Sequence, residues 1–153
     1  MGTIDGKLNM WADTLYALER GHLLRLLVWG ASSVLSATLL ITWLVWKRET
    51  APMLRHFAIQ SALAGGVIVL VAAWGWHGLE MRDFAGLQRL LNLLWFDAGL
   101  SSGYAALGAT LAMLGWRGFS RPSITGAGLG ITVQGIALLL FQLRIIAAIG
   151  PVR

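Results

Sequence analysis

The chain has 153 residues, of which 57% are hydrophobic and only 12% are charged. A soluble domain carries about 25% charged residues, so this composition excludes an ordinary water-soluble globule and predicts one membrane domain over residues 1–153. Twelve Lys and Arg against seven Asp and Glu give a net charge of +5. Because the basic residues are scattered among segment ends, we expect contact with membrane lipids and no nucleic-acid partner.

Four stretches are apolar over about 20 residues, which is the length that a helix needs to cross a bilayer. They occupy residues 26–46, 57–77, 94–116 and 124–146. None of the three prolines falls inside them, as expected for unbroken helices. The sequence therefore predicts an all-α integral membrane protein, a four-helix bundle in which short connections create two antiparallel hairpins.

The first predicted element is an amphipathic helix at residues 7–21. Its apolar residues recur at helical spacing with acidic residues elsewhere around the helix, which predicts a separate interfacial helix in the headgroup plane before the first span. Glu19, Arg20 and Arg25 stand where the first span enters the membrane. A charge at membrane depth is costly unless it is paired or solvated, so we expect these residues to form structural ion pairs.

The second span carries one amide, Gln60, which we expect to form a hydrogen bond with another helix. Residues 78–94 follow the second span and repeat the amphipathic pattern, with Arg82 and Arg89 opposite a stripe of leucines. This pattern predicts a second interfacial helix before the third span.

The third predicted span begins with a carboxylate, Asp97, and continues with many small residues. Gly99 and Gly103 have the GxxxG spacing, and Gly108 extends the small-residue pattern. Small residues let helix backbones approach closely where no hydrophobic force drives association. We therefore predict tight helix packing along this span, with dimerisation as the alternative.

The fourth predicted span repeats the same features. Gly126 and Gly130 again have the GxxxG spacing, and Gln134 is a second candidate for a hydrogen bond between helices. Arg144 lies near the end of the span, at the depth at which Asp97 begins the third. We expect Asp97 to pair with Arg144, Arg25 or Arg20; a proton relay or substrate site is the alternative.

The distribution of basic residues gives a small bias in orientation. The side of the membrane that holds the termini carries Lys7, Arg20, Arg25, Arg82, Arg89, Arg144 and Arg153. The opposite side carries Lys47, Arg48, Arg55, Arg117 and Arg121. The excess on the first side predicts cytoplasmic termini in a bacterial inner membrane.

Histidine is the only residue type that suggests a cofactor. His22 and His77 are on the same side and could ligate a tetrapyrrole from facing helices; the alternative is that both are solvated. No catalytic motif, phosphate-binding loop or metal-ligand spacing is present. We therefore expect no enzymatic activity, no catalytic residue and no metal site, with bound lipid or tetrapyrrole as the only candidate cofactors.

Four motifs resemble a family of uncharacterised bacterial membrane proteins with four spans. They are LERGHLLRLLVWGA at 18–31, HFAIQSALAGG at 56–66, FDAGLSSGYAALGATL at 96–111 and GLGITVQGIALLLFQL at 128–143. The family has no assigned activity. The resemblance implies a four-helix fold and a shared helix-packing core that contains residues 19–22, His56, Gln60, Asp97 and Gln134.

These observations predict a non-catalytic accessory subunit of a larger respiratory or photosynthetic membrane complex. The chain has almost no segment outside its predicted helices, and its apolar faces offer surface to other integral membrane subunits. The alternative is a small transporter or a protein that binds a lipid, quinone or tetrapyrrole. It would use the charged end of the bundle around His22, Asp97 and Arg144.

Overall fold

The computed structural model describes residues 2–118 and 120–150, with side chains from Ala12 onward. Its elements are α1 (Gly2–Lys47), α2 (Pro52–His77), α3 (Phe84–Met113), a π-helical turn η1 (Leu114–Gly118) and α4 (Pro122–Ile149). The described residues contain no strand, so the chain is all-α as predicted.

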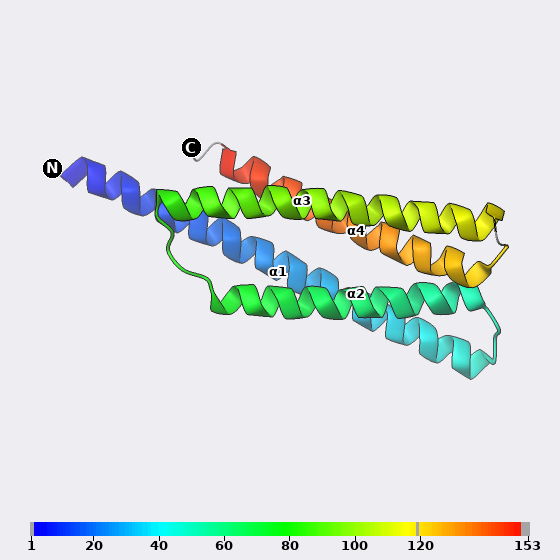
Figure 1. Cartoon of the computed structure of the whole chain (residues 1–153). Helices are drawn as coiled ribbons and strands as arrows, with labels where there is room; N and C mark the ends of the chain where they lie inside the picture. The colour runs from blue at the N-terminus through cyan, green and yellow to red at the C-terminus, as the bar shows by residue number, and fades with distance from the viewer. Residues whose placement is uncertain (1, 119, 151–153) are drawn as a thin grey trace.

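The helices lie side by side as two antiparallel hairpins, α1 with α2 and α3 with α4 (Figure 1). Both ends of the chain lie at one end of the bundle, here called the terminus end, and both hairpin connections lie at the other, the turn end (Figure 1). Helix α4 packs against each of the other three helices, whereas α2 and α3 make almost no backbone contact. This arrangement leaves a lateral gap between α2 and α3.

Local sequence signals explain where the helices begin. Pro52 and Pro122 each stand at the first position of a helix, where the missing N–H of proline costs nothing. Asp83 caps α3, because its Oδ1 accepts a hydrogen bond of 2.7 Å from the backbone N–H of Gly86. These residues explain where α2, α3 and α4 begin.

The structure has no separate interfacial helices before the first and third spans, so that prediction is wrong. Residues 7–21 belong to α1, and residues 84–94 belong to α3. No proline interrupts either helix, and leucines of the two helices pack against each other within the protein. The cluster that they form consists of Leu15, Leu87, Leu91, Leu94, Ile145 and Ile149.

Three helices are long and apolar enough to cross a membrane: residues Ala12–Lys47 of α1, the whole of α2 and the whole of α4. This finding is compatible with a membrane protein. Helix α3 does not meet the same criterion, so the predicted fourth span at 94–116 is not confirmed. Its first half contains Arg89, Asn92 and Asp97, which lower its hydropathy.

Glycine controls how closely the helices approach. At the α1–α2 crossing, a Cβ on Gly30 would lie 2.7 Å from the carbonyl oxygen of Gly65, and the reverse distance is the same. A Cβ on Gly108 would lie 2.5 Å from the amide nitrogen of Thr132, which fixes the approach of α3 to α4. Because real side chains do not reach such distances, these crossings require glycine.

Candidate functional site

An ion pair at the terminus end of the bundle joins α1 to the connection between α2 and α3. Glu19 of α1 accepts two hydrogen bonds from Arg82, one of 2.9 Å from Nε and one of 2.6 Å from a terminal nitrogen. The Glu19 side chain is buried, and Arg82 lies in the connection between α2 and α3. The hydrogen bonds to Glu19 raise the pKa of Arg82 above its ordinary value, so the pair holds this connection against α1 in its charged form.

Asp97 does not form the predicted ion pair. In the part of the chain whose side chains are described, Glu19–Arg82 is the one ion pair within 4.0 Å. Arg20 instead lies over the ring of Trp76, 5.6 Å from its centroid, and Arg144 is exposed. Arg25 is half-buried, and it lines a hollow on the outer side of α1 and α4.

The direction of Asp97 around α3 explains why the arginines do not reach it. Asp97, Ser101 and Tyr104 recur at helical spacing on one side of α3. Ser101 and Tyr104 line the gap between α2 and α3, and Asp97 is on their side of α3, one turn nearer the terminus end. Depth alone, which was the basis of the prediction, does not determine which side of a helix a residue occupies.

Among the side chains that the structure describes, two buried ones have a polar atom without a hydrogen-bond partner. These atoms are Nδ1 of His22 and Oε1 of Gln142, and both residues are more than nine-tenths buried. Leu15 of α1 and Ile149 of α4 belong to one core cluster. Because α1 and α4 are antiparallel, His22, seven residues after Leu15, is at the same level as Gln142, seven residues before Ile149. The two orphan atoms therefore lie at the same level of the bundle, and Gln142 carries an amide that the sequence analysis did not single out.

The structure does not pair His22 with His77. His22 is buried on α1, whereas His77 is exposed at the last residue of α2. No three acidic or histidine side chains gather into a possible metal site in the described residues. His56, which the resemblance places in the packing core, is exposed, and its ring bonds to the Pro52 carbonyl oxygen at 2.8 Å.

Gln134 joins α4 to α1 in the middle of the bundle. Its Oε1 accepts a hydrogen bond of 2.8 Å from the indole N–H of Trp29, and its Nε2 donates one of 3.0 Å to Ser33 Oγ. Gln134 is 2% exposed, so these hydrogen bonds take the place of bonds to water for its buried amide. Gln134 therefore forms the hydrogen bond between helices that its position in an apolar segment predicts. The sequence did not indicate that Trp29 is its partner.

A groove of about 410 Å³ opens between α2 and α3, and α4 forms its floor. Most of its lining is apolar, and the polar groups come from Gln60, Ser101, Tyr104 and Gln134. Gln60 Nε2 donates a hydrogen bond of 2.9 Å to Tyr104 Oη, which bridges the two helices that otherwise hardly touch. The groove therefore has apolar walls and a few fixed polar atoms.

The glycines of the two predicted GxxxG motifs have opposite environments. A Cβ on Gly126 would collide with the carbonyl oxygen of Met53, and one on Gly130 would lie 3.1 Å from Gln60 Cβ. These two glycines allow α4 to cross α2. A Cβ on Gly99 or Gly103 would meet nothing within 4 Å, so this pair makes no close approach within the chain.

Gly99 and Gly103 belong to a continuous exposed stripe on α3, here called the outer seam. Its residues alternate at spacings of four and three, and all are exposed: Asn92, Phe96, Gly99, Gly103, Ala106, Thr110 and Met113. This is the heptad spacing by which one helix faces another. The opposite face of α3 is buried, so the seam points away from the other three helices.

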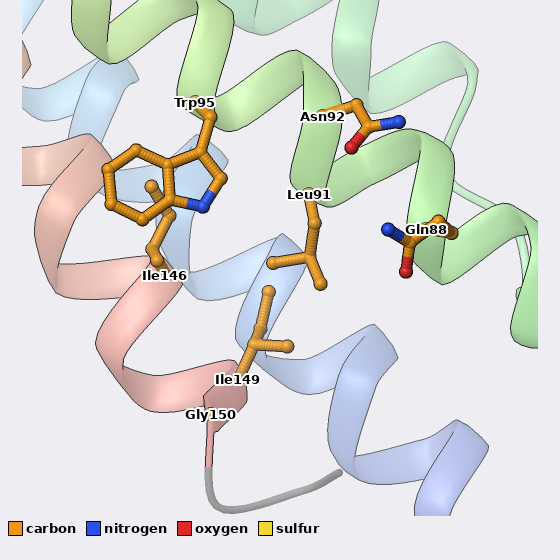
Figure 2. Close-up of a pocket in the computed structure, with 7 residues that line it drawn as sticks. All are labelled: Gln88, Leu91, Asn92, Trp95, Ile146, Ile149 and Gly150. Carbon is orange, nitrogen blue, oxygen red and sulfur yellow. The ribbon is translucent and has the colours of Figure 1, made fainter.

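A hollow of about 270 Å³ adjoins the terminus end of the outer seam, between α3 and the last turns of α4. Figure 2 shows Leu91 and Ile149 pointing toward each other at its base, with the Trp95 ring beside Ile146. The amide of Asn92 stands at its edge (Figure 2). The surface beside the seam is therefore recessed and partly polar rather than a smooth apolar cylinder.

The fold and these contacts define a small all-α protein whose buried polar groups and glycines hold long apolar helices together. Residues 25–143, most of the chain, match a family of unknown function, DUF6992, and the chain belongs to that family. The match agrees with the resemblance of the four motifs to an uncharacterised family. No curated protein and no solved structure matches the chain.

Proposed function

We propose that this protein is a non-catalytic, membrane-embedded subunit that binds a helix of another integral membrane protein along its outer seam. The observation that carries the proposal is the open pair Gly99 and Gly103. Elsewhere in the chain, glycines in such patterns allow a close helix crossing, whereas here the crossing partner is missing. A larger membrane complex, respiratory or photosynthetic, would supply that partner.

The polarity of α3 supports a protein partner rather than lipid on this side. Besides Phe96 and Met113, the seam exposes Asn92, Thr110 and three small residues. Helix α3 does not reach the hydropathy by which the other three helices are apolar enough to span a membrane. Lipid chains gain little from a surface of glycine and hydroxyl groups, whereas a neighbouring helix can pack closely against it. A partner helix would also fill the space beside Gly99 and Gly103.

The proposal includes α3 as a fourth spanning helix. Helix α3 has 30 residues, enough for about 45 Å at 1.5 Å per residue, and it lies antiparallel to α4, which is apolar enough to span. Close approaches to α4 at Gly108 of α3 and at Gly115 of the following turn η1 keep α3 and α4 at the same depth. The pair would insert together as a hairpin in the bacterial inner membrane, with the termini in the cytoplasm.

The topology can be tested with single cysteines, because the chain contains none. We expect Thr50→Cys and Arg117→Cys, one in each hairpin connection, to be labelled by an impermeant thiol reagent from the same side of the membrane. Labelling from opposite sides would contradict four spans.

The subunit proposal is tested by tagging the chain in its native host, solubilising the membrane mildly and identifying co-eluting proteins after size-exclusion chromatography. We expect a stoichiometric integral membrane partner. The variant Gly99→Ile with Gly103→Ile should release the chain from that partner, because the new side chains occupy the seam. Gly66→Ile is the matched control, since Gly66 on α2 also has nothing within 4 Å. A chain that elutes alone, or only with copies of itself, would overturn the proposal.

The groove between α2 and α3 supports a second candidate function, binding of a lipid or quinone. Its volume of about 410 Å³ is within the range of small-molecule sites, about 300–1,000 Å³, and its few polar atoms could orient a carbonyl or hydroxyl group. Ala64→Trp should fill the groove, whereas Ala73→Trp on the exposed side of α2 should not. A lipophilic molecule extracted from the unmodified chain and the Ala73 variant, but not from the Ala64 variant, would favour this function.

A further inference from the structure

The connection between α1 and α2 contains a cavity that neither proposed function uses. Its volume is about 440 Å³, and it lies at the turn end of the bundle. The last turns of α1 supply an apolar wall of Ile41, Leu44 and Val45. Arg48, Arg55 and His56 supply a basic rim, and Glu49 is the one carboxylate in the lining. The cavity therefore joins an apolar surface to a cluster of cationic side chains.

The backbone at Arg48 adopts a conformation that favours glycine. Helix α1 ends in a Schellman motif, in which the N–H of Arg48 donates to the Val45 carbonyl oxygen at 3.1 Å and that of Glu49 to Leu44 at 3.1 Å. Arg48 occupies the position after the helix where the chain turns left-handed, with φ of 54°. Glycine is the usual residue there because a Cβ is strained. An arginine at this position therefore carries a backbone strain that glycine would avoid.

The basic groups of the cavity have no anionic partner within the described chain. Neither Arg48 nor Arg55 forms an ion pair there, although Glu49 is adjacent in sequence. His56 donates from Nδ1 to the Pro52 carbonyl oxygen at 2.8 Å, which orients the ring and leaves Nε2 free of that bond. Two unpaired guanidinium groups beside an apolar wall suit a ligand that is anionic at one end and apolar at the other.

The start of α2 contributes side chains rather than backbone donors to the cavity. Its lining residues are Pro52, which has no N–H, Arg55, whose N–H donates to the Ala51 carbonyl oxygen at 3.0 Å, and His56. The donors that could hold a phosphodiester are therefore the guanidinium groups of Arg48 and Arg55.

We propose that the cavity binds an anionic phospholipid, whose phosphodiester lies between Arg48 and Arg55 and whose acyl chain lies along Ile41, Leu44 and Val45. The site is independent of the outer seam, which lies on a different hairpin. A free phosphate would satisfy the arginines but not the apolar wall. A zwitterionic lipid would bring a cation to a rim that already has an excess of positive charge.

The proposal is tested by native mass spectrometry of the detergent-solubilised chain titrated separately with phosphatidylglycerol, phosphatidylcholine and inorganic phosphate. We expect one phosphatidylglycerol to bind at least about tenfold more tightly than phosphatidylcholine, and phosphate not to compete at equal concentration. Equal binding of phosphatidylcholine would overturn the preference for an anionic lipid. Displacement of the lipid by phosphate would identify a phosphate site instead.

The variants R48G and R55Q should each weaken phosphatidylglycerol binding by about tenfold or more, the effect of losing one charge-assisted hydrogen bond. R48G should at the same time raise the melting temperature of the lipid-free chain, because glycine relieves the left-handed backbone. This opposite effect separates loss of the ligand from loss of the fold. The double variant R117Q/R121Q is the matched control, since both arginines are at the same end but outside the cavity. Equal weakening by the control, or unchanged binding in R48G, would overturn the site.

Discussion

Helix α3 uses glycine in two opposite ways on its two faces. Gly108, on the buried face, allows the α4 backbone to approach so closely that a Cβ would lie 2.5 Å from the Thr132 amide nitrogen. Gly99 and Gly103, on the outer seam, meet nothing within 4 Å. The same residue type is therefore a structural requirement on one face of the helix, whereas on the other face it has no close neighbour within the described residues. A small-residue motif therefore predicts close packing without identifying the partner.

The largest effect on stability is expected from adding a side chain to a glycine at a close helix crossing. In Gly126→Val, the new side chain would collide with the Met53 carbonyl oxygen, which cannot move without displacing α2. We expect a loss of about 3 kcal/mol in the free energy of unfolding, measured by tryptophan fluorescence in detergent. Gly66→Val is the control, because Gly66 has open space. Equal melting temperatures for the two variants would show that the α2–α4 crossing is not close.

Removal of Arg82 should cost about 2 kcal/mol, because Arg82→Ala leaves the buried Glu19 carboxylate without its two hydrogen bonds. The figure is below that for a fully buried pair, since the Arg82 side chain is 28% exposed. Thermal unfolding measures the effect, and Arg89→Ala on exposed surface is the control. Adding Glu19→Gln to Arg82→Ala should restore part of the stability. No recovery in the double variant would contradict a charge-based cause.

The two buried amides of α4 should respond differently to the same substitution. Gln134→Leu removes two hydrogen bonds between helices and should destabilise the chain by about 1 kcal/mol. Gln142→Leu removes an amide whose Oε1 has no described partner, and it should be neutral or stabilising. Thermal unfolding of both variants in the same detergent compares them. A destabilised Gln142→Leu would indicate that a bound water or ligand satisfies this amide.

The smallest effect is expected on the outer seam. Gly99→Ala should stabilise the isolated chain by about 0.5–1 kcal/mol, because alanine has the higher helix propensity and the added methyl group meets nothing. The same variant should weaken co-elution of the partner, since the methyl group holds the partner helix away. Stability and assembly would then change in opposite directions. A loss of stability in the isolated chain would show that another part of the same chain packs against the seam.

The sequence indicates which residues of the site form hydrogen bonds between helices, but it does not indicate their partners. An amide in an apolar span must find a hydrogen bond, so Gln134 and Gln60 could be selected from sequence. Their partners, Trp29 and Tyr104, depend on how helices rotate about their axes. The depth of Asp97 and Arg144 along their helices was predictable by counting residues, but the rotation that separates them was not.

The amino-acid sequence alone was enough to predict the all-α class, the apolar character of the helices and helix boundaries close to Pro52 and Pro122. These properties depend on local sterics and composition, which neighbouring segments do not change. The packing of the helices, by contrast, determines that the buried ion pair is Glu19–Arg82 rather than Asp97–Arg144, and the structure places residues 7–21 within α1. It also places Gly126 against the backbone of α2, whereas a Cβ on Gly99 would meet nothing within 4 Å. Each of these contacts depends on which helix faces lie together, and that choice is a property of the whole bundle.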